Sequence, residues 1–272
     1  MHVASALRAL AVCNALLAAG CAGERISIAQ SADSPNPPHA PLTAYLYMPD
    51  GARPHPTVIL LHGCSGLELE TAHRATWKIL NSQALRYVDR GYAALILDSY
   101  SGRGHQNLCD SNMLLPFEFR AWDAAAAARH LIGLGVAKPG QIVVQGMSAG
   151  GGSALEAAKR NGPGAMFAAA IAWYPKCEAS AFTGGFAAPV LILAGGADEW
   201  TTALECQVRI GRLTEDAIPT SEIVFKVYPG ATHAYDYPVV PRIYWGHFMT
   251  FDGDATRRSW AEVDAFLARH VR

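Results

Sequence analysis

The chain has 272 residues, of which 51% are hydrophobic and 17% are charged, and its formal net charge at pH 7 is -1. This length and composition suit one large α/β domain or two smaller ones, with enough apolar surface for a sizeable core. Because basic residues are not in excess, the chain lacks the positive field that holds a nucleic acid, and we expect no nucleic-acid partner.

The first 22 residues have the pattern of a secretory signal peptide. Arg8 is their only early charge, and an apolar stretch over 9–19 is followed by small residues. That stretch is too short to cross a bilayer comfortably, and no later stretch is long and apolar enough to do so. We therefore expect an exported protein, periplasmic or secreted. Two alternatives remain: a buried N-terminal helix, and a lipid anchor at Cys21, because Leu17–Cys21 resembles a bacterial lipoprotein cleavage site.

Cysteine usage is the second indication of export. Two of the six cysteines, Cys13 and Cys21, lie in the leader or at its end. The even number that remains could form disulfides in an oxidising compartment, with buried free thiols as the alternative. These cysteines are Cys64, Cys109, Cys177 and Cys206. None belongs to a C-x-x-C pair and the chain has no H-E-x-x-H, so we expect neither a metal site nor a cofactor.

The leader is followed by a segment, 23–41, that we expect to be a linker, because 31–41 is rich in Pro, Ser and Asp. From residue 42 to the C-terminus, apolar runs typical of buried strands alternate with helical patterns. The expected strands are 42–48, 57–63, 92–98, 141–146, 166–174, 189–196 and 222–228. The expected helices are 77–88, 117–134, one that starts at Ala149, 203–213 and 257–271.

Strands that alternate with helices predict a mostly parallel central sheet flanked by helices, formed by one domain over 42–272. In such a sheet, ligands bind beyond the carboxyl ends of the strands. The residues that directly follow each apolar run are therefore the candidates for chemistry.

The segment Gly146–Gly150 has the G-x-S-x-G pattern of a nucleophile elbow, in the expected place between a strand and a helix. A serine on such a sharp turn is raised above the sheet, and glycines on either side avoid collisions with the strand and the helix. The helix N-terminus then points at the hydroxyl, where N–H groups stabilise a developing oxyanion. We expect Ser148 to be a nucleophile; the alternative is a glycine turn that serves only packing.

A serine hydroxyl needs a base, and this type of fold orders its triad as Ser, then Asp or Glu, then His. Asp198 and His233 each lie just past an apolar run, so both fall at the same edge of the sheet as Ser148. We expect His233 to take the serine proton and Asp198 to orient its imidazole. Glu199 and His247 are the alternatives for these two roles.

The loop Leu61–Gly66, which follows another apolar run, contains an H-G-x-x-G pattern. Such a loop supplies the second half of an oxyanion hole, and the N–H of Cys64 is the expected donor, together with the N–H of Ala149. We expect His62 to order the loop through hydrogen bonds without carrying protons. The alternative is a capped turn with no part in catalysis.

These motifs together resemble the dienelactone hydrolase family of the α/β-hydrolase superfamily. The resemblance rests on LLHGCSGLE, GYAALILDSYSGRG, QGMSAGGG, ILAGGADEWT and VYPGATHAYD, in the family's order, and extends from Leu42 to the C-terminus. It implies an α/β-hydrolase fold and the hydrolysis of a lactone or an ester through a covalent acyl-enzyme. Carried over by motif, the triad is Ser148, Asp198 and His233.

Two positions depart from the family's pattern. The founding enzymes use a cysteine nucleophile where this chain has Ser148, and they carry a glutamate, linked to thiol activation, where this chain has Gly63. These departures favour an ordinary serine esterase over hydrolysis of dienelactone itself.

The sheet order of the superfamily also implies how the cysteines pair. It places Cys64 and Cys109 after adjacent strands, and it does the same for Cys177 and the helix that carries Cys206. The resemblance therefore implies the bridges Cys64–Cys109 and Cys177–Cys206, whereas the number of cysteines alone allows three pairings. The first bridge would stiffen the oxyanion loop.

The expected catalytic edge is also rich in aromatic residues. Trp200, Tyr174 and Tyr235, with the segment 241–251, could line an acyl pocket, and plain core packing is the alternative. Arg103, in a glycine-rich loop, could bind a substrate carboxylate or form a local salt bridge.

The leading hypothesis is an exported serine carboxylesterase that acts on small or medium esters or lactones. A peptidase or a polyester hydrolase of the same fold is the second hypothesis, although the chain has no added propeller or lid domain of the kind that an oligopeptidase carries. A non-catalytic binding protein is the third, and the complete triad argues against it.

Overall fold

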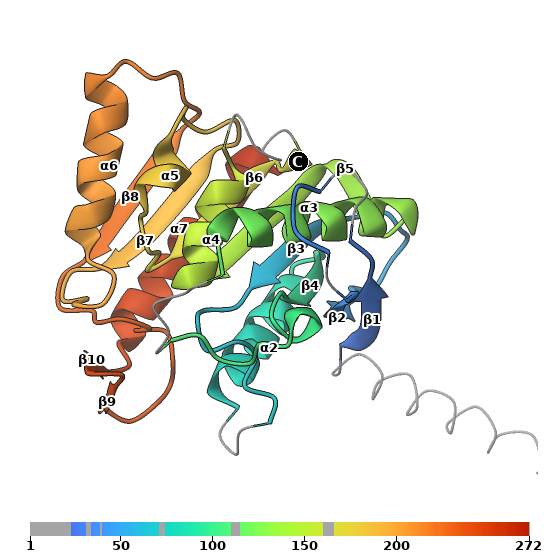
Figure 1. The fold of residues 1–272 in the computed structure, drawn as a ribbon, viewed down its shortest axis with the longest axis horizontal. Helices are drawn as coiled ribbons and strands as arrows, with labels where there is room; N and C mark the ends of the chain where they lie inside the picture. The colour runs from blue at the N-terminus through green and yellow to red at the C-terminus, as the bar shows by residue number, and fades with distance from the viewer. Residues whose placement is uncertain are drawn as a thin grey trace, which may run out of the picture.

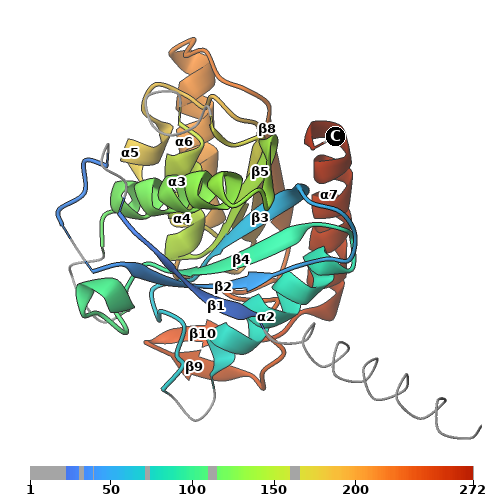
Figure 2. The same ribbon diagram turned by 90° about the vertical axis from the view of Figure 1, so that its right-hand side faces the viewer.

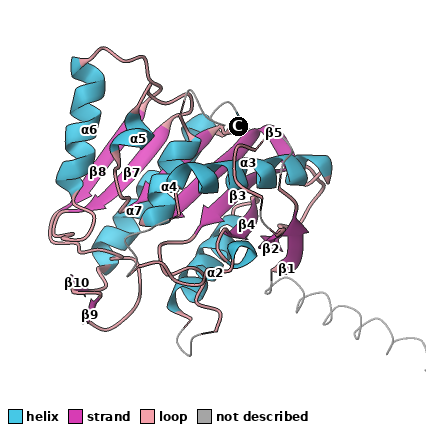
Figure 3. Ribbon diagram, viewed as in Figure 1, coloured by secondary structure: helices cyan, strands magenta, loops and turns pink. Residues whose placement is uncertain are grey.

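The computed structural model describes residues 23–30, 34–38, 40–70, 74–109, 115–159 and 166–271. The expected signal peptide, with Cys13 and the lipid-anchor candidate Cys21, lies outside these ranges. None of the helices within them combines the length and the apolar character that a membrane span requires. The described residues form a central sheet with helices on both faces (Figure 1 and Figure 3).

The central sheet, as far as the described ranges show it, has eight strands in the order β1-β2-β4-β3-β5-β6-β7-β8. The strands from β4 to β8 in this order run parallel to one another, whereas β1 and β2 are antiparallel to their neighbours. Their bounds are β1 Glu24–Ile28, β2 Leu42–Tyr47, β3 His55–Leu61, β4 Ala93–Asp98, β5 Ala137–Met147, β6 Ala169–Trp173, β7 Val190–Gly195 and β8 Ile223–Tyr228. The prediction of a mostly parallel sheet flanked by helices is confirmed.

The middle strands are apolar throughout because both of their faces are covered. Every residue of β4, β6 and β7 is buried, as is expected of parallel strands under two helical layers. The alternation of apolar and polar residues is therefore lost in these strands, and continuous apolar runs identify them in the sequence.

The first strand corrects the expected linker over 23–41. Residues 24–28 form β1, which pairs antiparallel with β2 from Glu24 opposite Leu46 to Ile28 opposite Leu42. Ile28 is buried against the core and Ile26 packs beside it. Isoleucines two residues apart lie on the same face of a strand. Because β1 is an edge strand of only five residues, these two isoleucines are its only apolar pattern in the sequence.

Two helical layers enclose the sheet. On one face lie α3 (Phe117–Gly133), α4 (Ala149–Ala157), α5 (Ala179–Phe182) and α6 (Ala203–Glu215). On the other face lie α2 (Ala75–Val88) and α7 (Gly253–His270). Figure 2 shows α2 and α7 on one side of the sheet and the remaining helices on the other. A 3-10 turn, η1 (Ser101–Arg103), follows β4.

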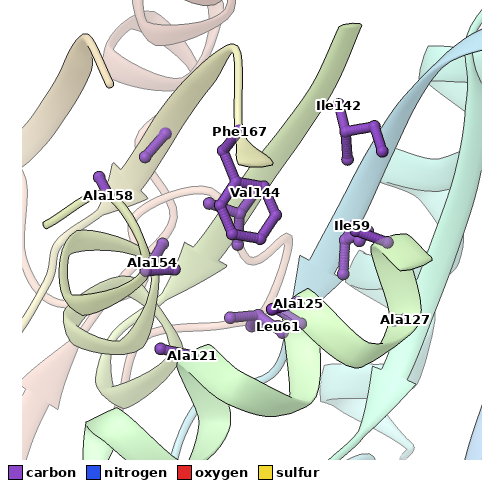
Figure 4. Packing of buried hydrophobic residues seen from close by; sticks show 14 of the residues in the cluster. Ile59, Leu61, Ala121, Ala125, Ala127, Ile142, Val144, Ala154, Ala158 and Phe167 are labelled. Carbon is purple, nitrogen blue, oxygen red and sulfur yellow. The ribbon is translucent and has the colours of Figure 1, made fainter. Parts of the chain in front are cut away.

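Alanine allows α3 to pack closely on its neighbours. The buried face of α3 carries Ala121 and Ala125, which contact a core that also includes Leu61 of β3, Val144 of β5 and Ala154 of α4 (Figure 4). A small side chain lets the helix axis approach the sheet and α4 at the same time. The alanine run of α3 is therefore a packing surface, and it supports the strand and the helix that flank Ser148.

The C-terminal third differs from expectation in two places. A short hairpin, β9 (Arg242–Tyr244) and β10 (His247–Met249), follows β8, which was expected to be the last strand. Helix α7 begins four residues before the expected start at residue 257, because the carboxylate of Asp252 accepts hydrogen bonds from the N–H groups of Asp254 and Ala255. This N-cap fixes where the helix starts.

Replacement of Ala125 by leucine tests the packing of α3. Ala125 is fully buried, so the added atoms have no space, and we expect Ala125→Leu to lower the free energy of unfolding by about 1–3 kcal/mol. Ala261→Leu is the matched control, because Ala261 is an exposed position of α7 and such a change costs less than about 0.5 kcal/mol. Urea unfolding measures both variants, and equal losses would contradict the tight packing of α3.

Candidate active site

Ser148 lies on a strained turn between β5 and α4. Its backbone angles are φ 54° and ψ -120°, a region that non-glycine residues seldom occupy. The turn is held on both sides: the N–H of Ser148 donates to the carbonyl of Trp173 at 2.9 Å, and its carbonyl accepts from the N–H of Gly152 at 3.1 Å. These hydrogen bonds hold the turn between β6 and α4, with Ser148 at the carboxyl end of β5.

The two outer glycines of the motif are required by close backbone contacts. A Cβ at Gly146 would lie within 3.0 Å of the carbonyl of Gly150 in α4. A Cβ at Gly150 would lie equally close to the carbonyls of Leu61 and His62, at the end of β3. Helix α4 thus starts in direct contact with both strands, and only glycine allows this approach.

The structure brings the three predicted triad residues together. The Nε2 of His233 lies 3.0 Å from the Oγ of Ser148, and its Nδ1 lies 2.8 Å from the Oδ2 of Asp198. Asp198 follows β7 and His233 follows β8, so both reach the same sheet edge as Ser148. Such a chain of hydrogen bonds can move the serine proton to the imidazole when the hydroxyl attacks a carbonyl.

The two alternatives for the orienting and basic roles lie elsewhere. Glu199 is exposed to solvent. The ring of His247 stacks on Trp200, with centroids 4.6 Å apart and an angle of 10° between the planes. Trp200 in turn lies between His247 and His233, whose centroid is 4.9 Å away.

Asp198 is held as an ionised acceptor. Its Oδ1 accepts from the N–H groups of Trp200 and Thr201 at 2.9 and 2.8 Å, and its Oδ2 lies 2.9 Å from the hydroxyl of Thr201. Burial alone would raise the pKa of Asp198, but the hydrogen bond and charge of His233, with these N–H groups, outweigh it and lower the pKa. The hydroxyl of Thr201 also lies 2.9 Å from the carbonyl of Tyr174. Sequence reasoning missed Thr201; its place three residues after Asp198 was the available signal.

The predicted oxyanion loop runs directly against Ser148, the expected nucleophile. A Cβ at Gly63 would lie 3.5 Å from the Cβ of Ser148, so the loop backbone passes at contact distance. Cys64 packs against Ala149 beside this point. Ala149 is the first residue of α4, and N–H groups in the first turn of a helix have no acceptor within that helix. The geometry therefore suits the two expected donors, the N–H groups of Cys64 and Ala149.

His62 orders this loop from its buried side. The side chain is fully buried, its Nδ1 lies 2.7 Å from the carbonyl oxygen of Gly63, and its Nε2 accepts the N–H of Ser99 at 3.3 Å. Burial and the positive charge of Arg120 lower the pKa of His62 to about 3. The imidazole is therefore neutral, with its proton on Nδ1. A guanidinium N–H of Arg120 also donates to the carbonyl of His62, which fixes the start of the loop.

Both predicted disulfides are present, Cys64–Cys109 and Cys177–Cys206. The first joins the oxyanion loop to the segment that follows η1, and the N–H of Leu108 also donates to the carbonyl of Cys64 at 2.9 Å. The second joins the segment after β6 to α6. Because disulfides persist in oxidising compartments, this pair indicates an exported protein.

A small cavity of about 40 Å³ opens above Ser148. Trp200 and Tyr174 line it, as predicted, and the segment 241–251 contributes Arg242, Tyr244 and Met249. A cavity of this volume holds little more than a reacting ester group and a short chain. Among the described residues, no cluster of three or more His, Cys, Asp and Glu side chains is placed to hold a metal ion.

The prediction that Tyr235 lines the pocket is wrong. Its ring is fully buried on the side of the sheet covered by α7, and its hydroxyl lies 2.7 Å from the Oγ of Ser259 in that helix. The ring also packs against Trp173, with centroids 6.1 Å apart. Tyr235 is thus a core residue, as the alternative interpretation held.

Arg103 does not bind at the catalytic edge either. Its guanidinium makes two hydrogen bonds to the carboxylate of Asp123, at 2.8 and 2.9 Å, and a third to the carbonyl of Ser99 at 2.7 Å. This pair is almost fully buried. The local salt bridge is therefore correct, and the role in carboxylate binding is not supported.

A second buried carboxylate lies behind the imidazole and was missed by sequence reasoning. Asp236 accepts from the hydroxyl of Tyr174 at 2.7 Å and from the amide of Gln83 at 3.1 Å. Gln145 donates to Gln83 at 3.0 Å, and Tyr87 donates to Gln145. Burial raises the pKa of Asp236 to about 6, because the hydrogen bonds from Tyr174 and Gln83 offset it only in part. Each hydrogen bond in this network is therefore donated in the direction of Asp236.

The fold and the geometry of the site together define an α/β-hydrolase. A model of the dienelactone hydrolase family matches residues 42–271. The chain belongs to this family, and it is a hydrolase that acts on ester bonds.

Solved structures with the same fold carry related descriptions. A protein named as a dienelactone hydrolase, from Klebsiella pneumoniae subsp. pneumoniae, has 19% sequence identity and a TM-score of 0.67, over 90% of this chain and 99% of that one. A dienelactone hydrolase-like promiscuous phosphotriesterase from metagenomic libraries has 18% identity and a TM-score of 0.67, over 92% and 100%. Esterase 2 of Thermogutta terrifontis has 16% identity and a TM-score of 0.63, over 91% and 92%. No curated protein matches the chain.

The bridge that holds the expected oxyanion loop should matter more for turnover than the bridge that joins the segment after β6 to α6. We expect Cys64→Ser/Cys109→Ser to lower kcat/KM for a soluble ester at least about tenfold, since a misplacement of roughly 1 Å can cost on the order of 100-fold. Cys177→Ser/Cys206→Ser is the control. The bridges span 45 and 29 residues, so by loop length each removal costs a similar amount of stability, about 4 kcal/mol. An equal fall in kcat/KM for both variants, assayed where both are folded, would contradict a specific role for Cys64–Cys109.

The buried Asp236 should make stability depend on pH. Because its pKa rises from 3.8 to about 6 on folding, the folded protein binds more protons than the unfolded chain between these values. Its contribution therefore favours folding below pH 4 and is lost as the pH rises to 6, by on the order of 3 kcal/mol. In Asp236→Asn this loss is absent. Urea unfolding at several pH values measures the difference between the two proteins, and a difference that does not change with pH would refute the assignment.

Proposed function

We propose that this protein is an exported serine esterase that cleaves small carboxylic esters or lactones through an acyl-enzyme. The observation that carries the proposal is the unbroken hydrogen-bonded line from the Oγ of Ser148 through His233 to Asp198. Its two distances, 3.0 and 2.8 Å, are those of direct hydrogen bonds.

The reaction follows from this geometry. As the Oγ of Ser148 attacks the ester carbonyl, its proton passes to the Nε2 of His233, and the carboxylate of Asp198 stabilises the resulting imidazolium. The carbonyl oxygen becomes an oxyanion, which the N–H groups of Cys64 and Ala149 stabilise. The imidazolium then returns the proton to the departing alkoxide. A water molecule, activated by His233, attacks the acyl-enzyme and releases the acid and the free serine.

The size of the cavity and the identity of the nucleophile point to the same class of substrate. A space of about 40 Å³ lies well below the volume of about 300–1,000 Å³ typical of sites that enclose a ligand. A short acyl group fits this cavity, whereas the remainder of a larger substrate stays outside. The serine nucleophile and Gly63 favour ordinary esters over dienelactone, whose founding hydrolases use a thiol.

Export is part of the proposal. The signal-peptide pattern over 1–22 and the two disulfides support a periplasmic or secreted protein. Lipidation at Cys21 would make it a membrane-anchored lipoprotein of the same compartment.

Covalent labelling tests the nucleophile. A fluorophosphonate probe should label the wild-type protein. A structure of esterase 2 of Thermogutta terrifontis, which has the same fold, shows that enzyme phosphorylated by paraoxon, another organophosphorus reagent. We expect Ser148→Ala to abolish labelling and to lower kcat for p-nitrophenyl acetate by a factor on the order of 10⁴ to 10⁶. Ser65→Ala is the control, because Ser65 lines the same cavity without contact to His233.

Two outcomes would reject the proposal. One is the absence of labelling in the folded wild-type protein. The other is labelling of Ser148→Ala to the extent of the wild type. A series of p-nitrophenyl esters of increasing acyl length then tests the size limit, and kcat/KM should fall once the acyl chain exceeds the cavity.

A further inference from the structure

The hairpin of β9 and β10 has two faces of opposite exposure. In its register Ile243 lies opposite Phe248, and Arg242 lies opposite Met249. Side chains alternate between the faces of a strand, so Arg242, Tyr244 and Met249 point into the cavity above Ser148. Ile243 and Phe248 therefore project from the other face, where they are 74% and 51% exposed.

Further exposed apolar side chains lie close to Ile243 and Phe248. Trp245, at the turn of the hairpin, is 49% exposed, and Val240, just before β9, is 79% exposed. The segment 238–251 contains only two residues that can carry a charge, Arg242 and His247. Arg242 lines the cavity and His247 stacks on Trp200, so neither belongs to the outer face. A hairpin in contact with water alone would carry polar side chains there, and an apolar group of this kind marks an interaction site.

The position of this face limits what can cover it. The hairpin forms part of the wall of the catalytic cavity, and that cavity holds only the reacting end of an ester. A larger substrate that leaves the cavity on the side of the hairpin passes the hairpin wall. Because the hairpin is only two strands wide and its inner face lines the cavity, its outer face lies beside the cavity wall.

A second copy of the chain fits this face less well. A stable protein interface takes about 20–30 residues from each partner, and this face presents three exposed apolar side chains, Ile243, Trp245 and Phe248, with Val240 exposed in the segment before it. An uncharged liquid or solid apolar surface has no such minimum, since each apolar side chain that leaves water contributes independently.

We propose that the outer face of the β9–β10 hairpin docks the protein onto a water-insoluble ester phase, so that esters at its surface enter the cavity from the docked side. This inference rests on the proposed esterase function, and it names the substrate class: uncharged esters that are presented by a droplet or an aggregate. Arg242, Tyr244 and Met249 on the inner face guide the reacting group, while Ile243, Phe248 and Trp245 contact the phase.

The experiment compares one acyl group in two physical states. The substrates are p-nitrophenyl butyrate in solution and emulsified tributyrin, which transfer the same butyryl group to Ser148. We expect Ile243→Ser/Phe248→Ser to keep kcat/KM for the soluble ester within about twofold and to lose about tenfold or more on the emulsion, because two apolar side chains no longer leave water on docking. Leu134→Ser/Val208→Ser is the matched control, with positions 53% and 43% exposed outside the hairpin, and it should match the wild type in both assays.

Adsorption separates docking from turnover. The protein with Ser148→Ala should float with tributyrin droplets, and addition of Ile243→Ser and Phe248→Ser should leave it in the aqueous phase. If no protein hydrolyses the soluble ester, the esterase function itself fails. If the soluble ester is hydrolysed but the hairpin variant keeps its activity on the emulsion, the docking face is refuted. A wild-type dimer that the hairpin variant converts to a monomer, in analytical ultracentrifugation, would assign the face to a second copy and would also overturn the inference.

Discussion

The contact between the start of α4 and the end of β3 is the constraint on which the site depends. Gly150 lies against the carbonyls of Leu61 and His62 with no space for a side chain. This contact places the first turn of α4 beside the loop that leaves β3, and Ser148, with its strained φ, lies directly before this turn. Ser148, the expected nucleophile, and both expected oxyanion donors are therefore positioned by one packing contact between two neighbouring strands and a helix.

Tyr174 couples the other two triad residues to the interior. Its carbonyl contacts the hydroxyl of Thr201, which also contacts the carboxylate of Asp198. Its ring lies 4.9 Å from the ring of His233, and its hydroxyl donates to Asp236. One buried tyrosine thus connects the acid of the triad, the base of the triad and the polar network between the sheet and α2. The imidazole of His233 lies beside the rings of Tyr174 and Trp200 and is hydrogen-bonded to Asp198, so its orientation is set before a substrate arrives.

The sequence was most informative where a local pattern and the topology act together. The long apolar runs identified the parallel strands because both faces of these strands are buried. The rule that chemistry follows such runs then located Ser148, Asp198 and His233 from positions far apart in the chain. The glycines of the motif could be interpreted physically for the same reason, since each lies where two elements meet.

The sequence was least informative where a side chain's surroundings depend on distant elements. Tyr235 lies two residues after His233, yet its ring points toward α7. No feature of the neighbouring sequence indicates this direction. Asp236 becomes a candidate for a role near the site because Gln83, from α2, and Tyr174, from the end of β6, both donate hydrogen bonds to it. Neither partner is near Asp236 in the sequence. The strand β1 is short and forms by pairing with β2 at the edge of the sheet. The hairpin β9–β10 is also short, and its inner face packs as part of the cavity wall.

The position of β1 has a consequence for how the enzyme would be displayed at a membrane. Only two residues lie between Cys21 and Glu24, the first residue of β1, and an extended chain advances at most about 3.6 Å per residue. A lipid attached at Cys21 would therefore hold the edge strand within about 11 Å of the bilayer surface, with no flexible stalk between them. The sheet would be oriented with respect to the membrane by its own first strand.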